Sequence, residues 1–193
     1  MITRQEALGI LNEYTKSESL LTHALCVEAS MRWYAKYFRE NEEKADVWGI
    51  TGLLHDFDYE RYPDPESGGH PYKGNEILKS NGIPEEISNA IMGHALFTGI
   101  PRDTLMAKTL FAVDELSGLV FASVLVRPDK SIHTLESSSL KKKMKDKAFA
   151  KGCNRDEIRQ GAEELGIELT VHIGNVILAM REVAKEIGLD GIR

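Results

Sequence analysis

The chain has 193 residues, of which 42% are hydrophobic and 7% aromatic, so it is long enough for one domain with a sizeable core and is not a disordered chain. Its 24 basic and 30 acidic residues give a net charge of −6, which argues against binding to a nucleic-acid backbone, because that backbone attracts a basic surface. The charge does not exclude a small anionic substrate, since a bound metal or a local basic cluster can reverse the sign of the field.

The sequence favours a cytoplasmic location. No apolar run reaches the roughly 18 residues that a membrane span needs, so we expect no contact with a membrane. The N-terminus has no basic segment followed by an apolar one, so we expect no secretory signal. Cys26 and Cys153 lie far apart in helical patterns, which is typical of free thiols in a reducing compartment.

Nearly every segment has the apolar spacing of a helix. The predicted helices, in chain order, cover residues 3–14, 18–37, 41–56, 72–80, 84–94, 104–126, 138–151, 155–165 and 168–187. Thr3 and Glu6 have the spacing of a capping box, Asn41 suits a helix cap, and Pro84 suits a first helical position. Prolines and glycines mark 57–69 as a loop.

The last predicted helix shows the helical pattern most clearly. Its apolar residues fall on one stripe, at Ile173, Val176, Ile177, Met180, Ala184 and Ile187. No segment alternates for long enough to indicate a strand. We therefore predict an all-α fold, a single-domain helical bundle of about eight to nine helices over residues 1–193 with no substantial sheet. Residues 138–187 are expected to form C-terminal helices, either a subdomain or a lid.

Several polar residues interrupt otherwise apolar helices. They are His23, the pair His55-Asp56, His94 and Asp114. Residues three and four apart share a helix face, so these side chains are expected to point into the core or along its edge. Three glycines near them, Gly52, Gly93 and Gly118, are expected to leave room between the helices.

Imidazoles and carboxylates together make a mixed nitrogen and oxygen ligand set. Such a set suits divalent Mn, Fe, Co, Ni or Zn, and less cleanly Mg. Because the set contains no thiolate, a structural zinc site of the cysteine type is not expected. Four protein ligands leave positions open for water or substrate, as in a catalytic site.

The order His23, then His55-Asp56, then Asp114 resembles the HD-domain superfamily of metal-dependent phosphohydrolases. The resemblance covers roughly residues 18–126, the expected metal-binding core. The runs "LLHDFDYE", "GNEILKSNGIPEEI", "DELSGLV" and "VRPDK" are similar to a bacterial subgroup of small HD-domain hydrolases. The resemblance implies a helical bundle of the HD type and one divalent metal ion held by these four residues.

Some HD-domain proteins bind a second ion through two further histidines, with the Asp of the pair as the bridge. His70 and His94 have suitable places in the order, so the resemblance leaves open one ion or two. His94 is the better candidate because of its apolar surroundings. His133 and His172 are expected to be surface residues.

The resemblance implies hydrolysis of a phosphate ester by a metal-activated water, on a nucleotide or another small phosphorylated metabolite. Asp58 and Glu60 are candidates for orienting water or moving a proton, and Lys73 is a candidate cation. Further candidates for binding the substrate phosphate are Arg127, Lys130, Lys143 and Lys147.

Two other functions remain open at this point. Some HD-domain proteins use two irons for an oxygen-dependent oxidation, which needs a similar set of ligands. The domain can also be non-catalytic, with a metal or nucleotide as a structural or sensing element. The sequence does not indicate the oligomeric state.

Overall fold

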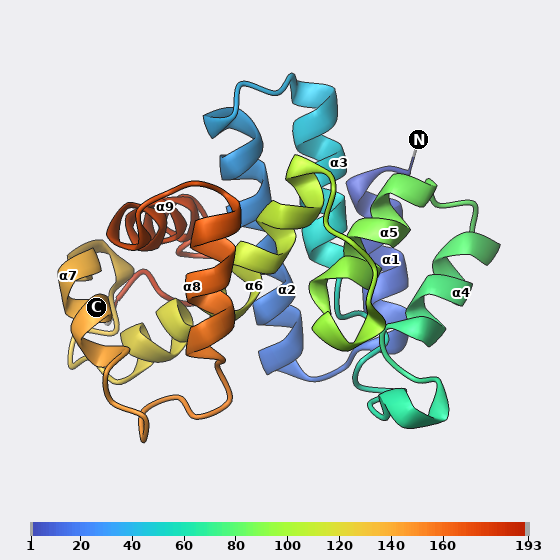
Figure 1. Cartoon of the computed structure of the whole chain (residues 1–193). Coiled ribbons are helices and arrows are strands. Elements are labelled where there is room, and N and C mark those ends of the chain that lie inside the picture. Colours follow the sequence, from blue (N-terminus) through green and yellow to red (C-terminus); the bar gives the residue numbers. More distant parts are fainter. Residues whose placement is uncertain (1, 192–193) are drawn as a thin grey trace.

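The structure is a computed structural model that describes residues 2–191, and this part of the chain is all-helical with no strand. Figure 1 shows its helices in chain order. They are α1 (Arg4–Tyr14), α2 (Glu18–Tyr37), α3 (Glu42–Leu54), α4 (Tyr72–Ser80), α5 (Glu85–His94), α6 (Leu105–Leu125), α7 (Ser137–Lys143), α8 (Arg155–Glu164) and α9 (Leu169–Glu182). Three short 3-10 helices lie between them, at Pro65–Ser67, Leu96–Thr98 and Ile132–Thr134. The all-α prediction is confirmed.

Two helices begin where their capping residues predict, and a third begins one residue later than expected. The side chain of Thr3 accepts from the backbone of Glu6 in a complete capping box. Asn41 accepts from the backbone N–H of Lys44 at the start of α3. Pro84 is the residue before α5 rather than its first helical residue.

Helices α2 and α6 pass through the middle of the molecule (Figure 1). Helices α1, α3, α4 and α5 lie to one side of them, and α7, α8 and α9 to the other. Gly52 allows α3 to approach α2 closely, because a Cβ there would come within 2.9 Å of the carbonyl oxygen of Val27. Gly161 allows the same between α8 and Ala112 of α6, with a Cβ at 2.5 Å from its Cα. The expectation that Gly52 leaves an opening is therefore wrong, since this glycine permits tight packing.

Two predicted helices end early. Helix α7 stops at Lys143 rather than at residue 151, because the lysine-rich run places only Leu140 and Met144 in the core. The following residues form turns, and Ala150 has a left-handed φ of 41°, which a helix does not contain. Helix α9 stops at Glu182 rather than at residue 187, and the rest of its apolar stripe packs from a turn.

The C-terminal helices share one core with the rest of the chain. Buried residues of α7, α8 and α9, such as Leu140, Ile158 and Val176, belong to the same hydrophobic cluster as those of α2 and α6. Whether residues 138–187 move as a lid stays a prediction. No helix within residues 2–191 has both the length and the apolar character needed to cross a membrane.

Candidate metal centre

Six histidine and aspartate side chains meet where four helices and one loop converge. His23 comes from the first half of α2, and Asp114 from the middle of α6. The pair His55-Asp56 follows the last turn of α3, and His94 is the last residue of α5. His70 comes from the loop before α4. The structure thus brings together all six residues that the sequence singled out as metal ligands.

The first group contains the residues of the linear sequence pattern. Ligand atoms of His23, His55 and Asp56 all lie within 4.8 Å of one another. Asp114 Oδ1 is 3.0 Å from His23 Nε2 and 3.4 Å from His55 Nε2. These distances suit a shared cation between the side chains, because metal–ligand bonds of about 2 Å place neighbouring ligand atoms roughly 3 Å apart.

The second group shares Asp56 with the first. Ligand atoms of Asp56, His70 and His94 lie within 4.8 Å of one another. Asp56 Oδ1 is 3.3 Å from His70 Nε2 and 3.4 Å from His94 Nε2. The other oxygen, Oδ2, is 3.4 Å from His55 Nε2 in the first group. One carboxylate therefore presents one oxygen to each group.

The backbone fixes which nitrogen each buried imidazole presents. His55 Nδ1 lies 2.8 Å from the carbonyl oxygen of Gly52, and His94 Nδ1 contacts the carbonyl of Ile91. A carbonyl only accepts, so Nδ1 donates and the neutral ring presents Nε2 as a lone pair. His55 Nε2 is buried and makes no hydrogen bond within residues 2–191. A bound cation would satisfy this atom, so the residues fit a metal ion.

His70 is oriented by Asp58, a residue on the far side of the ring from the cluster. Asp58 is fully buried, and its Oδ1 accepts from His70 Nδ1 at 2.7 Å. Its Oδ2 accepts from the backbone N–H of Gly74 at 2.6 Å. Both oxygens are thus engaged away from the cluster. These contacts are those of a residue that positions His70, whereas the expected role in orienting water or moving a proton stays a prediction.

Sequence reasoning did not single out Gly74. A Cβ at this position would lie 2.7 Å from Asp58 Cγ, so only glycine lets the first turn of α4 approach the carboxylate. The available signal was a glycine inside a short helix, because such a residue costs helix stability and indicates close packing.

The charges of the cluster hold its carboxylates ionised. Burial by itself lowers the pKa of His55, but the charges of Asp56 and Asp114 outweigh it and raise the pKa well above 6.5. Burial likewise favours the neutral acid at Asp56, yet His55 and His94 lower its pKa well below 3.8. The site therefore attracts positive charge, which protons or a divalent cation can supply.

The cluster opens into a pocket of about 480 Å³. Apart from the ligands, its wall includes Tyr59, Leu96, Phe97, Glu115, Cys153 and Glu157. Burial and the charge of Asp114 raise the pKa of Glu115 to about 7. Glu115 follows the candidate ligand Asp114 in the sequence. Glu157 lies in α8, and nothing in the sequence indicated that it would line this pocket. Gly118 also lines this pocket, and a Cβ built on it would lie 4.0 Å from His23 Nδ1.

Six other predicted site residues lie outside this pocket. Glu60 Oε2 accepts from the N–H groups of Lys16 and Ser17, at 2.7 and 2.9 Å, so it fixes the start of α2. Lys73 pairs with Glu76 at 2.7 Å. The remaining four are Arg127 beside Asp129, Lys130 on the surface, Lys143 over the ring of Phe149, and Lys147 in a separate pocket. For Glu60 and Lys73, the contacts place both residues away from the cluster, and a catalytic role for them stays a prediction.

His172 is not a surface residue. Its side chain is fully buried, with Nδ1 accepting from the Tyr34 hydroxyl at 2.5 Å and Nε2 donating to the carbonyl oxygen of Ala112 at 2.9 Å. His133 is exposed as predicted and pairs with Asp190 at 2.9 Å.

Of three comparisons with known proteins, one found a match, and that match is to a family model. No curated protein and no solved structure matches the chain. A family model described as HD domain matches residues 20–119, more than half of the chain and the part that contains all six candidate ligands. The chain therefore belongs to the HD domain family.

Proposed function

We propose that the chain is a metal-dependent phosphohydrolase that hydrolyses a phosphate ester of a nucleotide or another small phosphorylated metabolite. The family consists generally of metal-dependent hydrolases. The observation that carries the proposal is the carboxylate of Asp56, which presents one oxygen to each of two ligand groups at the base of an open pocket. Two ions held by these groups would supply the chemistry of phosphate ester hydrolysis.

In this proposal His23, His55, Asp56 and Asp114 would hold the first ion. Asp56, His70 and His94 would hold the second. When bound, such ions supply Lewis acidity, which activates water near neutral pH and balances the charge of the phosphoryl group.

The chain's own residues supply orientation. The carbonyls of Gly52 and Ile91 and the carboxylate of Asp58 each accept from one Nδ1–H, so three imidazoles keep Nε2 toward the cluster. Because His55 and Asp58 are fully buried, these orientations are fixed before substrate arrives. Catalysis depends on this fixed placement.

Metal analysis of the purified chain tests the ligand assignment. We expect two ions per chain in the wild type, none in Asp56→Ala, and one in His94→Ala. His133→Ala is the matched control, because it removes an imidazole that lies outside the cluster and should keep both ions. Equal metal content in all four proteins would contradict the assignment.

An activity screen tests the reaction. Phosphomonoesters and phosphodiesters are incubated with Mn, Co, Mg, Fe, Ni or Zn, and we expect release of phosphate or of a phosphomonoester that Asp114→Ala abolishes without unfolding the chain. Two bound irons with uptake of O₂ and no phosphate release would favour the oxygenase instead. Metal binding with neither activity would favour a structural or sensing role.

A further inference from the structure

A second pocket adjoins the candidate metal centre and carries the opposite charge. Its volume is about 720 Å³, and it lies between the turns that follow α7 and the start of α8. Its charged lining residues are Lys145, Lys147, Lys151, Arg155 and Arg159, with Asp156 as the one acid. In a chain with a net charge of −6, this concentration of cations stands apart, and we call it the basic pocket.

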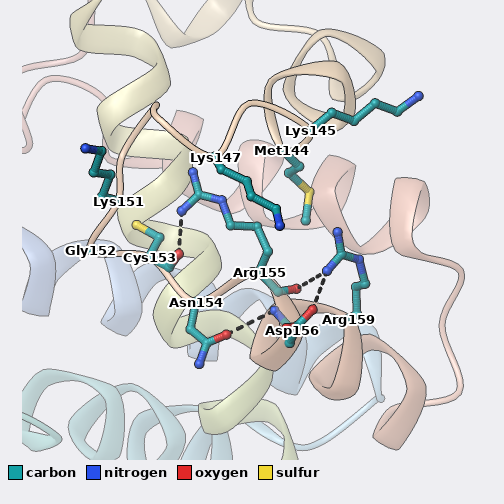
Figure 2. A pocket seen from close by; sticks show the side chains of 10 residues that line it. All are labelled: Met144, Lys145, Lys147, Lys151, Gly152, Cys153, Asn154, Arg155, Asp156 and Arg159. Atoms are coloured by element: carbon teal, nitrogen blue, oxygen red, sulfur yellow. Dashed lines mark hydrogen bonds and ion pairs between the residues drawn. The ribbon is translucent and has the colours of Figure 1, made fainter.

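The basic pocket has a built wall, and three of its lysines, Lys145, Lys147 and Lys151, make no ion pair within residues 2–191. The guanidinium of Arg155 donates to the backbone carbonyls of Phe149, Ala150 and Cys153, which ties down the turn 149–153. Figure 2 shows Lys147 extending into the space between Arg155 and Arg159. Lys147 has no ion-pair partner within the part of the chain that the structure describes.

The two pockets share a wall. Gly152 and Cys153 line both the basic pocket and the pocket of the metal centre. A Cβ built at Gly152 would meet no atom within 4 Å, so the space beside this residue is open. A single small molecule can therefore contact both pockets across one turn of the backbone.

Charge decides which part of such a molecule belongs in each pocket. Glu115 and Glu157 line the metal pocket in addition to the ligands. A bound metal would attract one phosphoryl group there, but no lysine or arginine among residues 2–191 lines this pocket to balance a further anionic group of the same substrate. The basic pocket, which shares the wall at Gly152 and Cys153, supplies cations for that second group. Lysine and arginine bind phosphate through charge-assisted hydrogen bonds.

We propose that the basic pocket binds a phosphate group of the substrate that is not hydrolysed. The preferred substrate is then a small molecule with two separated phosphate groups, one at the metal centre and one beside Lys147. This inference rests on the proposed function. A phosphate group in this pocket has two possible sources, the substrate itself or a separate free phosphate, and the experiments below distinguish them.

The first experiment compares matched esters. We measure kcat/KM for a bisphosphate and divide it by kcat/KM for the corresponding monophosphate. One pair is adenosine 3′,5′-bisphosphate and adenosine 5′-monophosphate, and the other is fructose 1,6-bisphosphate and fructose 6-phosphate. We expect Lys147→Glu to lower the ratio by about tenfold or more for at least one pair. Lys79→Glu, the same exchange in α4 on the other side of the molecule (Figure 1), should leave it within about twofold of the wild type.

The second experiment measures binding without metal. Inorganic pyrophosphate is titrated into the full chain in EDTA by calorimetry, and we expect Lys147→Glu, but not Lys79→Glu, to weaken its affinity by about tenfold. Weakened binding together with an unchanged kcat/KM ratio would overturn the assignment to the substrate and indicate a separate phosphate ligand. Equal binding in the wild type and in both variants would overturn the pocket itself.

The same pair of experiments separates this inference from the proposed function. If no ester is hydrolysed with any divalent ion, monophosphates included, the proposed function fails and the assignment of the phosphate to a substrate fails with it. The calorimetric result in EDTA still decides whether the basic pocket binds phosphate, because that measurement involves neither metal nor turnover.

Discussion

The buried imidazole of His172 makes the stability of the fold depend on pH. Burial lowers the pKa of His172 from 6.5 to about 4, because desolvation disfavours the charged ring and outweighs the hydrogen bond to the Ala112 carbonyl, which by itself raises the pKa. The unfolded chain therefore binds more protons than the folded chain between these two values. The stability due to neutral His172 is present above pH 6.5 and is lost as the pH falls toward 4.

The size of the effect follows from the two pKa values. At pH 5 an imidazole with a pKa near 6.5 is almost fully protonated, whereas one with a pKa of about 4 is only about one-tenth protonated. The free energy of unfolding at pH 5 is then about 2 kcal/mol lower than at pH 7.5 through this residue alone.

Urea unfolding of the wild type and of His172→Gln isolates this contribution. Unfolding is followed by the fluorescence of Trp33 and Trp48 in EDTA, so that metal occupancy does not change with pH. Titrating carboxylates act on both proteins and cancel in the difference. We expect the free energy of unfolding of the wild type, minus that of the variant, to fall by about 2 kcal/mol between pH 7.5 and pH 5. A difference that stays constant over this range would refute the reasoning.

Four further outcomes follow from the geometry. Gly74→Ala should lower the free energy of unfolding by about 1–3 kcal/mol, measured by urea unfolding, because its Cβ would meet the Asp58 carboxylate. Asp58→Asn should weaken the second ion's binding about 10–100-fold in a Mn²⁺ titration, because one of its two accepted hydrogen bonds is lost. Arg102→Ala should cost about 2 kcal/mol in the same unfolding assay, because it removes a two-bond contact to Glu164 at 2.9 and 2.6 Å. Metal binding at pH 7 should release protons, seen as binding enthalpies that differ between buffers, because the cluster raises the pKa of its buried imidazoles.

The helices and the candidate ligands were largely predictable from the sequence. Apolar spacing and caps such as Thr3 and Asn41 are local signals, and they mark the helices where the structure has them. The candidate ligands carry a signal of another kind, because a histidine or aspartate among apolar neighbours is costly unless something compensates it. His23 and Asp114 are 91 positions apart in the sequence, and His23 Nε2 lies 3.0 Å from Asp114 Oδ1 in the structure.

The supporting residues were not predictable in the same way. Glu60 and Asp58 are both acids near the His-Asp pair, yet Glu60 holds the backbone just before α2 and Asp58 contacts His70. Only the path of the 57–71 segment decides between these roles. His172 sits on an apolar helix like His23, but its partners come from α2 and α6, and a sequence does not reveal which helices will surround a given face.

The two ligand groups differ in what holds them in place. His23, His55 and Asp114 project from α2, the end of α3 and α6, which pack through buried residues and the close contact at Gly52. His70 instead depends on a loop, and its orientation depends on Asp58 and on the backbone of Gly74. Because packed helices move less than loops, the first group is formed by the fold itself, whereas the second forms only when the loop is in place. Loss of the loop contacts should therefore remove the second ion and the activity that needs two ions, while the first ion stays bound.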